Sequence, residues 1–150
     1  MKQLLTALTS QIALQVPYLR WVGVLESELL PPEEPGFPIV GLLDGGTVND
    51  SRPGQKDIQT LTVIVLPYQS IILDEPGAAM MGSDHLGSEG KGLLEMGDRL
   101  RTLLNDNFLN LSFYWAHCDR QEPCRTLQSI KKDDTFVQYQ RNTFTYRRYV

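Results

Sequence analysis

The chain has 150 residues and a formal net charge of −4 at neutral pH. That length suits one domain, which can bury a core without metals or disulfides. The acidic balance argues against a free-standing nucleic-acid-binding protein, which usually carries a basic surface. No apolar run approaches the roughly 18 residues of a membrane span, and the N-terminal residues show no secretory signal. We therefore expect Cys118 and Cys124 to be thiols in a reducing compartment.

The first part of the chain begins with a helical pattern. Leu4, Leu8 and Ile12 recur at every fourth position. This spacing predicts an amphipathic helix over residues 1–16 that ends before Pro17. The segments predicted after it are a strand over 18–25, an exposed acidic and proline-rich loop over 31–36, a strand over 37–43, a turn at 44–46 and a polar loop over 47–55.

The densest β pattern lies over residues 57–72. Leu61, Val63 and Val65 share one face of an extended chain, and β-branched residues dominate the segment. This pattern predicts the central strand of a small sheet. Pro67 cannot donate a backbone hydrogen bond, so we expect strand pairing to break or bulge there.

The second half of the chain opens on its most irregular part, the glycine-rich residues 73–91. A loop this long is usually functional or mobile. The clearest helix follows over residues 92–106, where Leu93, Met96 and Leu100 share one face. Further strands are predicted over 109–118, 125–130 and 135–150, with a turn at 119–123 and a bulge near residues 141–142.

The predicted elements follow one another as a helix, three strands, a long loop, a second helix and two or three strands. This order predicts a single α+β domain over residues 1–150. In it, one mostly antiparallel β-sheet carries two helices packed on one face.

A phosphate-binding loop is one chemical site that the sequence partly imitates. Gly90-Lys91 precedes a predicted helix, as in a P-loop. However, the position five residues before Gly90 is His85 rather than glycine. Gly92 also stands where Ser or Thr would hold magnesium.

Metal binding and catalysis are predicted to be absent. His117, Cys118 and Cys124 lack a fourth ligand at a suitable spacing for zinc. Ser83-Asp84-His85 cannot form a catalytic triad by adjacency, because neighbours on an extended chain point apart. With no pair of nucleophile and base, we expect no enzyme activity and no cofactor.

Two groups of residues are predicted to lie at interfaces between subunits. Met80, Met81 and Leu86 lie in the irregular loop, where they would expose apolar surface that contact with another copy would bury. The second group is the only basic–aromatic cluster, in which Arg141, Arg147 and Arg148 alternate with Tyr139, Tyr146 and Tyr149.

The basic–aromatic cluster allows two interpretations. Nucleic acid could stack on its rings. Alternatively, its arginines could pair with acidic groups of a neighbouring strand or subunit. The negative net charge of the chain favours the second interpretation.

Together these patterns resemble the tail terminator, or tail completion, proteins of tailed bacteriophages. The resemblance covers most of the chain. It implies a β-sheet packed by helices and assembly into a hexameric ring. It rests on the N-terminal helix, the glycine turn at 44–46, the strand TLTVIVLPY (60–68), the helix LLEMGDRLRTLL (93–104) and the final strand NTFTYRRYV (142–150).

The resemblance also implies a place in the virion, at the head-proximal end of the tail. There the ring would stop polymerisation of the tail tube and join the tail to the neck. The implied partners are further copies of the chain, the tube protein, the neck or stopper protein and, in some tails, the sheath. DNA would pass through the lumen without specific binding, which an acidic protein favours. The family has no catalytic residues.

Two alternatives remain open from the sequence. The chain could be a different neck or tail component, such as a head-closure stopper or a tube protein. It could also be a small cytoplasmic ligand-binding domain.

Overall fold

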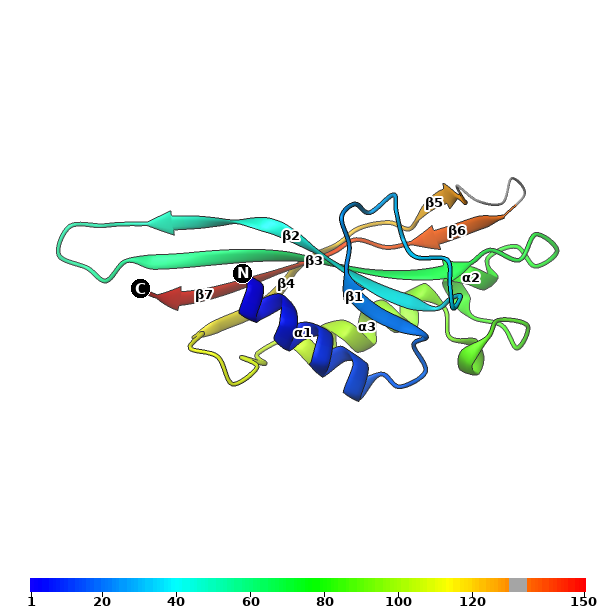
Figure 1. Cartoon of the computed structure of the whole chain (residues 1–150), viewed down its shortest axis with the longest axis horizontal. Coiled ribbons are helices and arrows are strands. Elements are labelled where there is room, and N and C mark those ends of the chain that lie inside the picture. Colours follow the sequence, from blue (N-terminus) through cyan, green and yellow to red (C-terminus); the bar gives the residue numbers. More distant parts are fainter. Residues whose placement is uncertain (130–134) are drawn as a thin grey trace.

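The computed structural model describes residues 1–129 and 135–150, which form a mixed sheet with helices against one face (Figure 1). None of the helices in these ranges is long and apolar enough to cross a membrane. In chain order the elements are α1 (Lys2–Gln15), β1 (Trp21–Val24), β2 (Ile39–Asp50), β3 (Ile58–Ser70), α2 (Ala78–Met81), the 3-10 helix η1 (Ser88–Gly90), α3 (Leu93–Leu104), β4 (Trp115–Gln121), β5 (Arg125–Gln128), β6 (Phe136–Tyr139) and β7 (Asn142–Tyr149).

Strand β3 is the centre of the sheet, as predicted. It pairs with β2 along one edge and with β6 and β7 along the other, antiparallel in each case. Strand β4 continues the sheet beyond β7, and β5 continues it beyond β6. Within the described chain the only parallel pair is β1 with β2. The predicted α+β class with a mostly antiparallel sheet is therefore confirmed.

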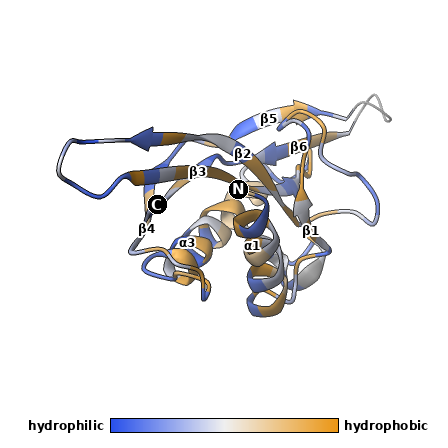
Figure 2. Cartoon of the chain, turned by 60° about the vertical axis from the view of Figure 1, so that its left-hand side comes forward, coloured by the Kyte–Doolittle hydropathy of each residue, from blue (hydrophilic) through white to orange (hydrophobic). Residues whose placement is uncertain are grey.

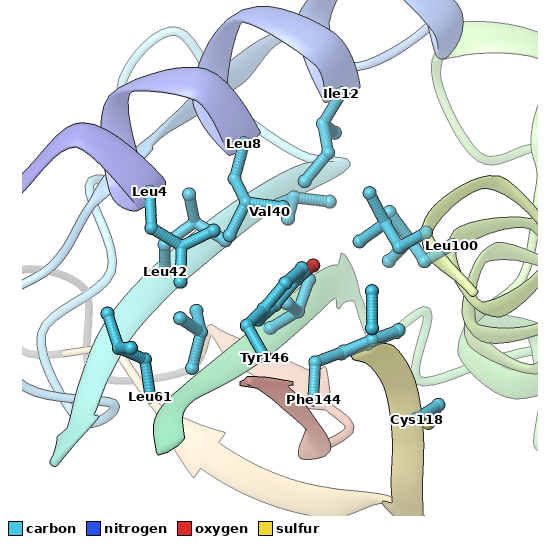
Figure 3. Close-up of a cluster of buried hydrophobic side chains, with 14 of the residues drawn as sticks. Leu4, Leu8, Ile12, Val40, Leu42, Leu61, Leu100, Cys118, Phe144 and Tyr146 are labelled. Carbon is cyan, nitrogen blue, oxygen red and sulfur yellow. The ribbon is translucent and has the colours of Figure 1, made fainter. Parts of the chain in front are cut away.

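Helices α1 and α3 lie side by side beneath one face of the sheet (Figure 2). Leu4, Leu8 and Ile12 point from α1 into the core, where Leu100 of α3 and Tyr146 of β7 meet them (Figure 3). Burial of each large apolar side chain stabilises the fold by about 1.5–3 kcal/mol. The sheet contributes Val40, Leu42, Leu61, Val63, Val65, Ala116, Cys118 and Phe144 to the same core.

The opposite face of the sheet is covered over only part of its area. There the segment after β1 packs over a second core that includes Leu66, Tyr68 and Tyr139. The rings of Tyr68 and Tyr139 stack with centroids 5.2 Å apart. The Tyr68 hydroxyl donates to the Glu28 backbone oxygen at 2.6 Å, which ties the covering segment to the sheet.

The glycine turn predicted at residues 44–46 is wrong. Strand β2 continues through it, and the register with β3 shifts between Asp44 and Thr47, which marks a bulge. Gly46 has a φ of +103° and donates its N–H to Asp44 Oδ1 at 2.8 Å. A glycine with positive φ lets a strand absorb an extra residue without ending. Residues 47–50, predicted as loop, are therefore strand, and they extend the β2–β3 hairpin beyond the helices (Figure 1).

The interruption expected at Pro67 falls on one edge of β3 only. On the β2 side the ladder is continuous, and Pro67 pairs with Val40. On the other side β7 pairs as far as Val65 and β6 takes over at Tyr68. Pro67 thus lies where the partner strand changes, so its missing N–H leaves no ladder position unpaired.

The strand predicted over residues 109–118 is displaced along the chain. Leu109 and Asn110 have φ values of +57° and +56° and belong to a turn, and β4 begins only at Trp115. Within β4, Ala116 and Cys118 are buried while Trp115 is exposed. Strand β4 also runs to Gln121, into the turn predicted at 119–123.

The prediction for the C-terminal strands is confirmed in outline. Strand β5 fits the pattern over 125–130, although residue 130 lies outside the described residues. The long pattern over 135–150 divides into β6 and β7 at residues 140–141, next to the predicted bulge.

Candidate interaction surfaces

The irregular segment 73–91 is a closed unit rather than an open loop. It contains α2 and η1, and the Ser83 N–H donates to the Gly90 backbone oxygen at 3.0 Å. The two sides approach so closely that a Cβ atom at Gly92 would lie 2.3 Å from the Met80 carbonyl oxygen. Gly82, Gly90 and Gly92 therefore let the backbone near residues 80–83 contact the backbone near residues 90–92. The sequence pattern did not predict this contact.

The three apolar residues predicted at an interface differ in exposure. Met81 is 74% exposed, and Met80 is partly buried. Leu86 is only 6% exposed, because the turn in which its N–H donates to the Ser83 oxygen folds it inward. The prediction that Leu86 exposes apolar surface is therefore wrong, and of the three Met81 offers the most surface to a partner.

A carboxylate clamp holds this segment together. Glu75 accepts a hydrogen bond from the Ser83 hydroxyl through Oε2 and contacts His85 Nδ1 through Oε1. The hydrogen bond from Ser83, followed by that from His85, lowers the pKa of Glu75 below its ordinary value of 4.5. Since Ser83 donates to the carboxylate and not to the imidazole, the arrangement does not activate a nucleophile.

Lys91 forms an ion pair with Glu95 in the first turn of α3, so this region does not form a phosphate-binding loop. Lys91 Nζ lies 3.0 Å from Glu95 Oε1, one turn further along the chain. This contact places a negative charge where a phosphate would have to bind.

His117, Cys118 and Cys124 do not converge. Cys118 packs in the core beneath the sheet, whereas His117 is exposed and lies 4.0 Å from Asp119 Oδ1. Both cysteines are free thiols, and burial raises the pKa of each. Over residues 1–129 and 135–150, no three His, Cys, Asp or Glu side chains gather in a way that could hold a metal ion.

Arg141 forms an ion-pair network inside the chain. Its Nη1 lies 2.9 Å from Glu28 Oε1, and its Nε lies 3.2 Å from Glu122 Oε2. Glu122 also pairs with Arg125 at 3.0 Å. Glu122 directly follows β4 and Glu28 lies in the segment after β1, so Arg141 pairs with acidic groups of two other segments of its own chain. Its predicted place at a subunit interface stays a prediction.

Arg147 and Arg148 make different contacts from Arg141. Arg147 lies over the Trp115 ring with its guanidinium carbon 5.2 Å from the centroid. Arg148 donates from Nε to Gln59 Oε1 at 2.7 Å and lies 5.6 Å from the centroid of Phe113. Among the described residues, no carboxylate lies within ion-pair distance of either arginine.

Exposed aromatic rings gather around the end of β7. Tyr149 stacks on Tyr114 with centroids 4.5 Å apart, and Lys56 Nζ lies 5.1 Å from the Tyr149 centroid. Tyr149 remains 53% exposed and Val150 66% exposed. We call these four residues, with Arg147 and Arg148, the aromatic end.

An apolar groove lies at a different place on the molecule. It has a volume of about 240 Å³ and runs between residues 29–33 and strands β5 and β6. Leu29 and Leu30 are half exposed on its wall, and Glu33 at its border contacts the Ser129 hydroxyl. We call it the proline groove; its apolar lining consists of Leu29, Leu30, Pro31, Pro32, Leu127 and Val137.

Comparison with known proteins identifies no family for this chain: no protein-family model matches it, and neither does any curated protein sequence.

Proposed function

We propose that the chain is a structural virion protein that forms a ring at the head-proximal end of a phage tail. In this role it ends polymerisation of the tail tube and joins the tail to the neck. The observation that carries the proposal is the separation of two exposed apolar surfaces, the aromatic end and the proline groove, on one small domain. A subunit that contacts two neighbours needs two such surfaces.

The polar groups of the chain also favour assembly over chemistry. Arg141 is held by Glu28 and Glu122, Lys91 by Glu95, and Glu75 by Ser83 and His85. In each of these clusters a charged side chain has a partner within the same chain. They therefore support a rigid building block.

The resemblance to tail terminator proteins gives the proposal its place in the virion. The fold supports the proposal, since the resemblance implies a β-sheet packed by helices. The net charge of −4 suits a ring through which DNA slides, because like charges weaken adhesion.

The direct test is tube assembly with purified tube protein of the same phage. Tubes grown in the presence of the chain should stop at a uniform short length and carry one ring of added density at one end. Two outcomes would overturn the proposal. The chain could polymerise by itself into long cylinders, as a tube protein does, or it could leave tube length unchanged.

A further inference from the structure

The aromatic end and the proline groove both expose apolar side chains. The aromatic end consists of exposed side chains at the end of β7 together with Tyr114 and Lys56. The groove is an apolar recess of about 240 Å³, smaller than the 300–1,000 Å³ of typical ligand pockets. A recess of this size suits a few side chains better than a cofactor or a helix.

The two surfaces lie too far apart on one subunit to meet each other. In Figure 1 the C-terminus and β7 lie toward the left of the long axis, beside the β2–β3 hairpin, whereas β5 and β6 lie toward the right. Contact between them therefore requires two copies of the chain.

Their charges are also complementary. The aromatic end contains three cations, Lys56, Arg147 and Arg148. Neither arginine has an acidic partner among the described residues. Residues 29–33 form one wall of the groove, and the segment 26–34 that contains them has four glutamates and no lysine or arginine. Of these, Glu26 and Glu34 are exposed. Charge pairs at the rim of an interface contribute little affinity, but they fix its orientation and partner.

We infer that the aromatic end of one copy docks in the proline groove of the next copy. The inference rests on the proposed ring and names the contact that closes it. Such a contact joins two different surfaces, so a growing assembly has a free groove at one end and a free aromatic end at the other. A heterologous contact of this kind gives a closed ring when its rotation closes.

Nucleic acid is a less suitable occupant for the aromatic end. Asp50 and Asp57 lie on the same hairpin end, so acidic side chains stand close to the cations of the aromatic end. A nucleic-acid site usually belongs to a domain with a net basic footprint, which this chain of net charge −4 lacks.

The contact can be tested by site-specific photo-crosslinking. Tyr149, an exposed residue, is replaced by p-benzoylphenylalanine, and ¹⁵N-labelled and unlabelled chains are mixed before irradiation. Mass spectrometry should find mixed-isotope crosslinks to residues 29–33. Rings with crosslinks only to other segments would overturn the inference and leave the proposed ring intact. Absence of any assembly would overturn both.

Charge reversal gives a second test that does not depend on crosslinking. Lys56→Glu with Arg147→Glu, and separately Glu26→Arg with Glu34→Arg, should each weaken self-association by about tenfold or more. Mixing the two variants should restore assembly, because each supplies the surface that matches the other. The matched control is Arg101→Glu on the exposed side of α3, which should leave assembly unchanged.

The charge variants also separate the remaining alternatives. If the mixture stays as weak as either variant alone, the two surfaces do not meet and the inference is wrong. If the wild type retains single-stranded DNA and Lys56→Glu with Arg147→Glu abolishes that retention without affecting assembly, the aromatic end serves nucleic acid and the inference fails.

Discussion

Two buried tyrosines differ in whether the hydroxyl group has a hydrogen-bond partner. The Tyr68 hydroxyl donates to the Glu28 oxygen, whereas the Tyr146 hydroxyl has no hydrogen-bond partner among the described residues. Both side chains are fully buried, and burial raises the pKa of each well above its ordinary value. A buried donor without an acceptor costs free energy, whereas a paired one contributes.

Replacement of these tyrosines by phenylalanine should therefore have opposite effects. Tyr146→Phe should raise the free energy of unfolding by about 1 kcal/mol, since it removes an unpaired hydroxyl. Tyr68→Phe, its matched control, should lower it by about 1 kcal/mol or more, since it leaves the Glu28 oxygen unpaired. Urea denaturation measures both values. Equal losses in the two variants would contradict this account.

The Arg141 network gives a second prediction for a single residue. Arg141→Met removes the cation that lies between Glu28 and Glu122, both of which are largely buried. The free energy of unfolding should fall by about 1.5–3 kcal/mol. Arg99→Met, at an exposed position of α3, should cost far less. Similar losses in the two variants would show that the network contributes no stability.

At the scale of elements, backbone contact closes the segment 73–91. Gly92 has an ordinary φ of −88°, but a side chain there would collide with the backbone of Met80 and Gly82. Gly77 is the opposite case, with a φ of +81° and open space around it. The first glycine is needed for close approach and the second for its conformation.

Alanine substitutions should separate these two requirements. Gly92→Ala should open the segment and abolish hydrogen-exchange protection of the Ser83 N–H. Gly77→Ala should lower the free energy of unfolding by about 1–2 kcal/mol through its left-handed backbone and leave that protection in place. Exchange measured by NMR reports both. Retained protection in Gly92→Ala would contradict the proposed packing.

The Glu75 clamp predicts a dependence on pH. The folded state holds the pKa of Glu75 below 4.5, so the clamp contributes stability above about pH 4.5 and loses it as the pH falls through the folded pKa. A ¹³C NMR titration of the Glu75 carboxyl should show a midpoint below 4.5. Ser83→Ala should move the midpoint upward, because the Ser83 hydrogen bond is the largest cause of the shift. A midpoint that does not respond would refute the clamp.

The sequence predicted best the elements whose apolar period is strong. Helices α1 and α3 and strand β3 lie where spacing placed them, because one continuous core buries their apolar faces. The strand at 109–118 was misplaced because Leu109, Leu111 and Phe113 alternate as a strand would, although the first two belong to a turn. The turn at 44–46 was predicted from residue types, and pairing with β3 outweighed that local preference.

The candidate surfaces were harder to predict, because their residues are far apart in the chain. Arg141 and Glu28 are 113 positions apart, and no local pattern joins them. The proline groove likewise forms only when residues 29–33 lie against β5. Arg147 and Arg148 could be identified as part of a basic–aromatic cluster because they follow one another near the C-terminus. The sequence could not predict that these two arginines contact aromatic rings rather than acidic groups.

At the scale of the whole molecule, the β2–β3 hairpin and the aromatic end lie away from the proline groove (Figure 1). A monomer in solution would leave all of these exposed. Heterologous contact between copies would bury the aromatic end of one against the proline groove of the next. Closure of the ring would leave neither surface exposed.

The most direct test of this account is the mass and shape of the purified protein, measured by analytical ultracentrifugation and negative-stain electron microscopy. The account predicts a single closed ring of about six times the 17.0-kDa chain mass. A protein that stays monomeric at high concentration, even beside tail tubes, would contradict it.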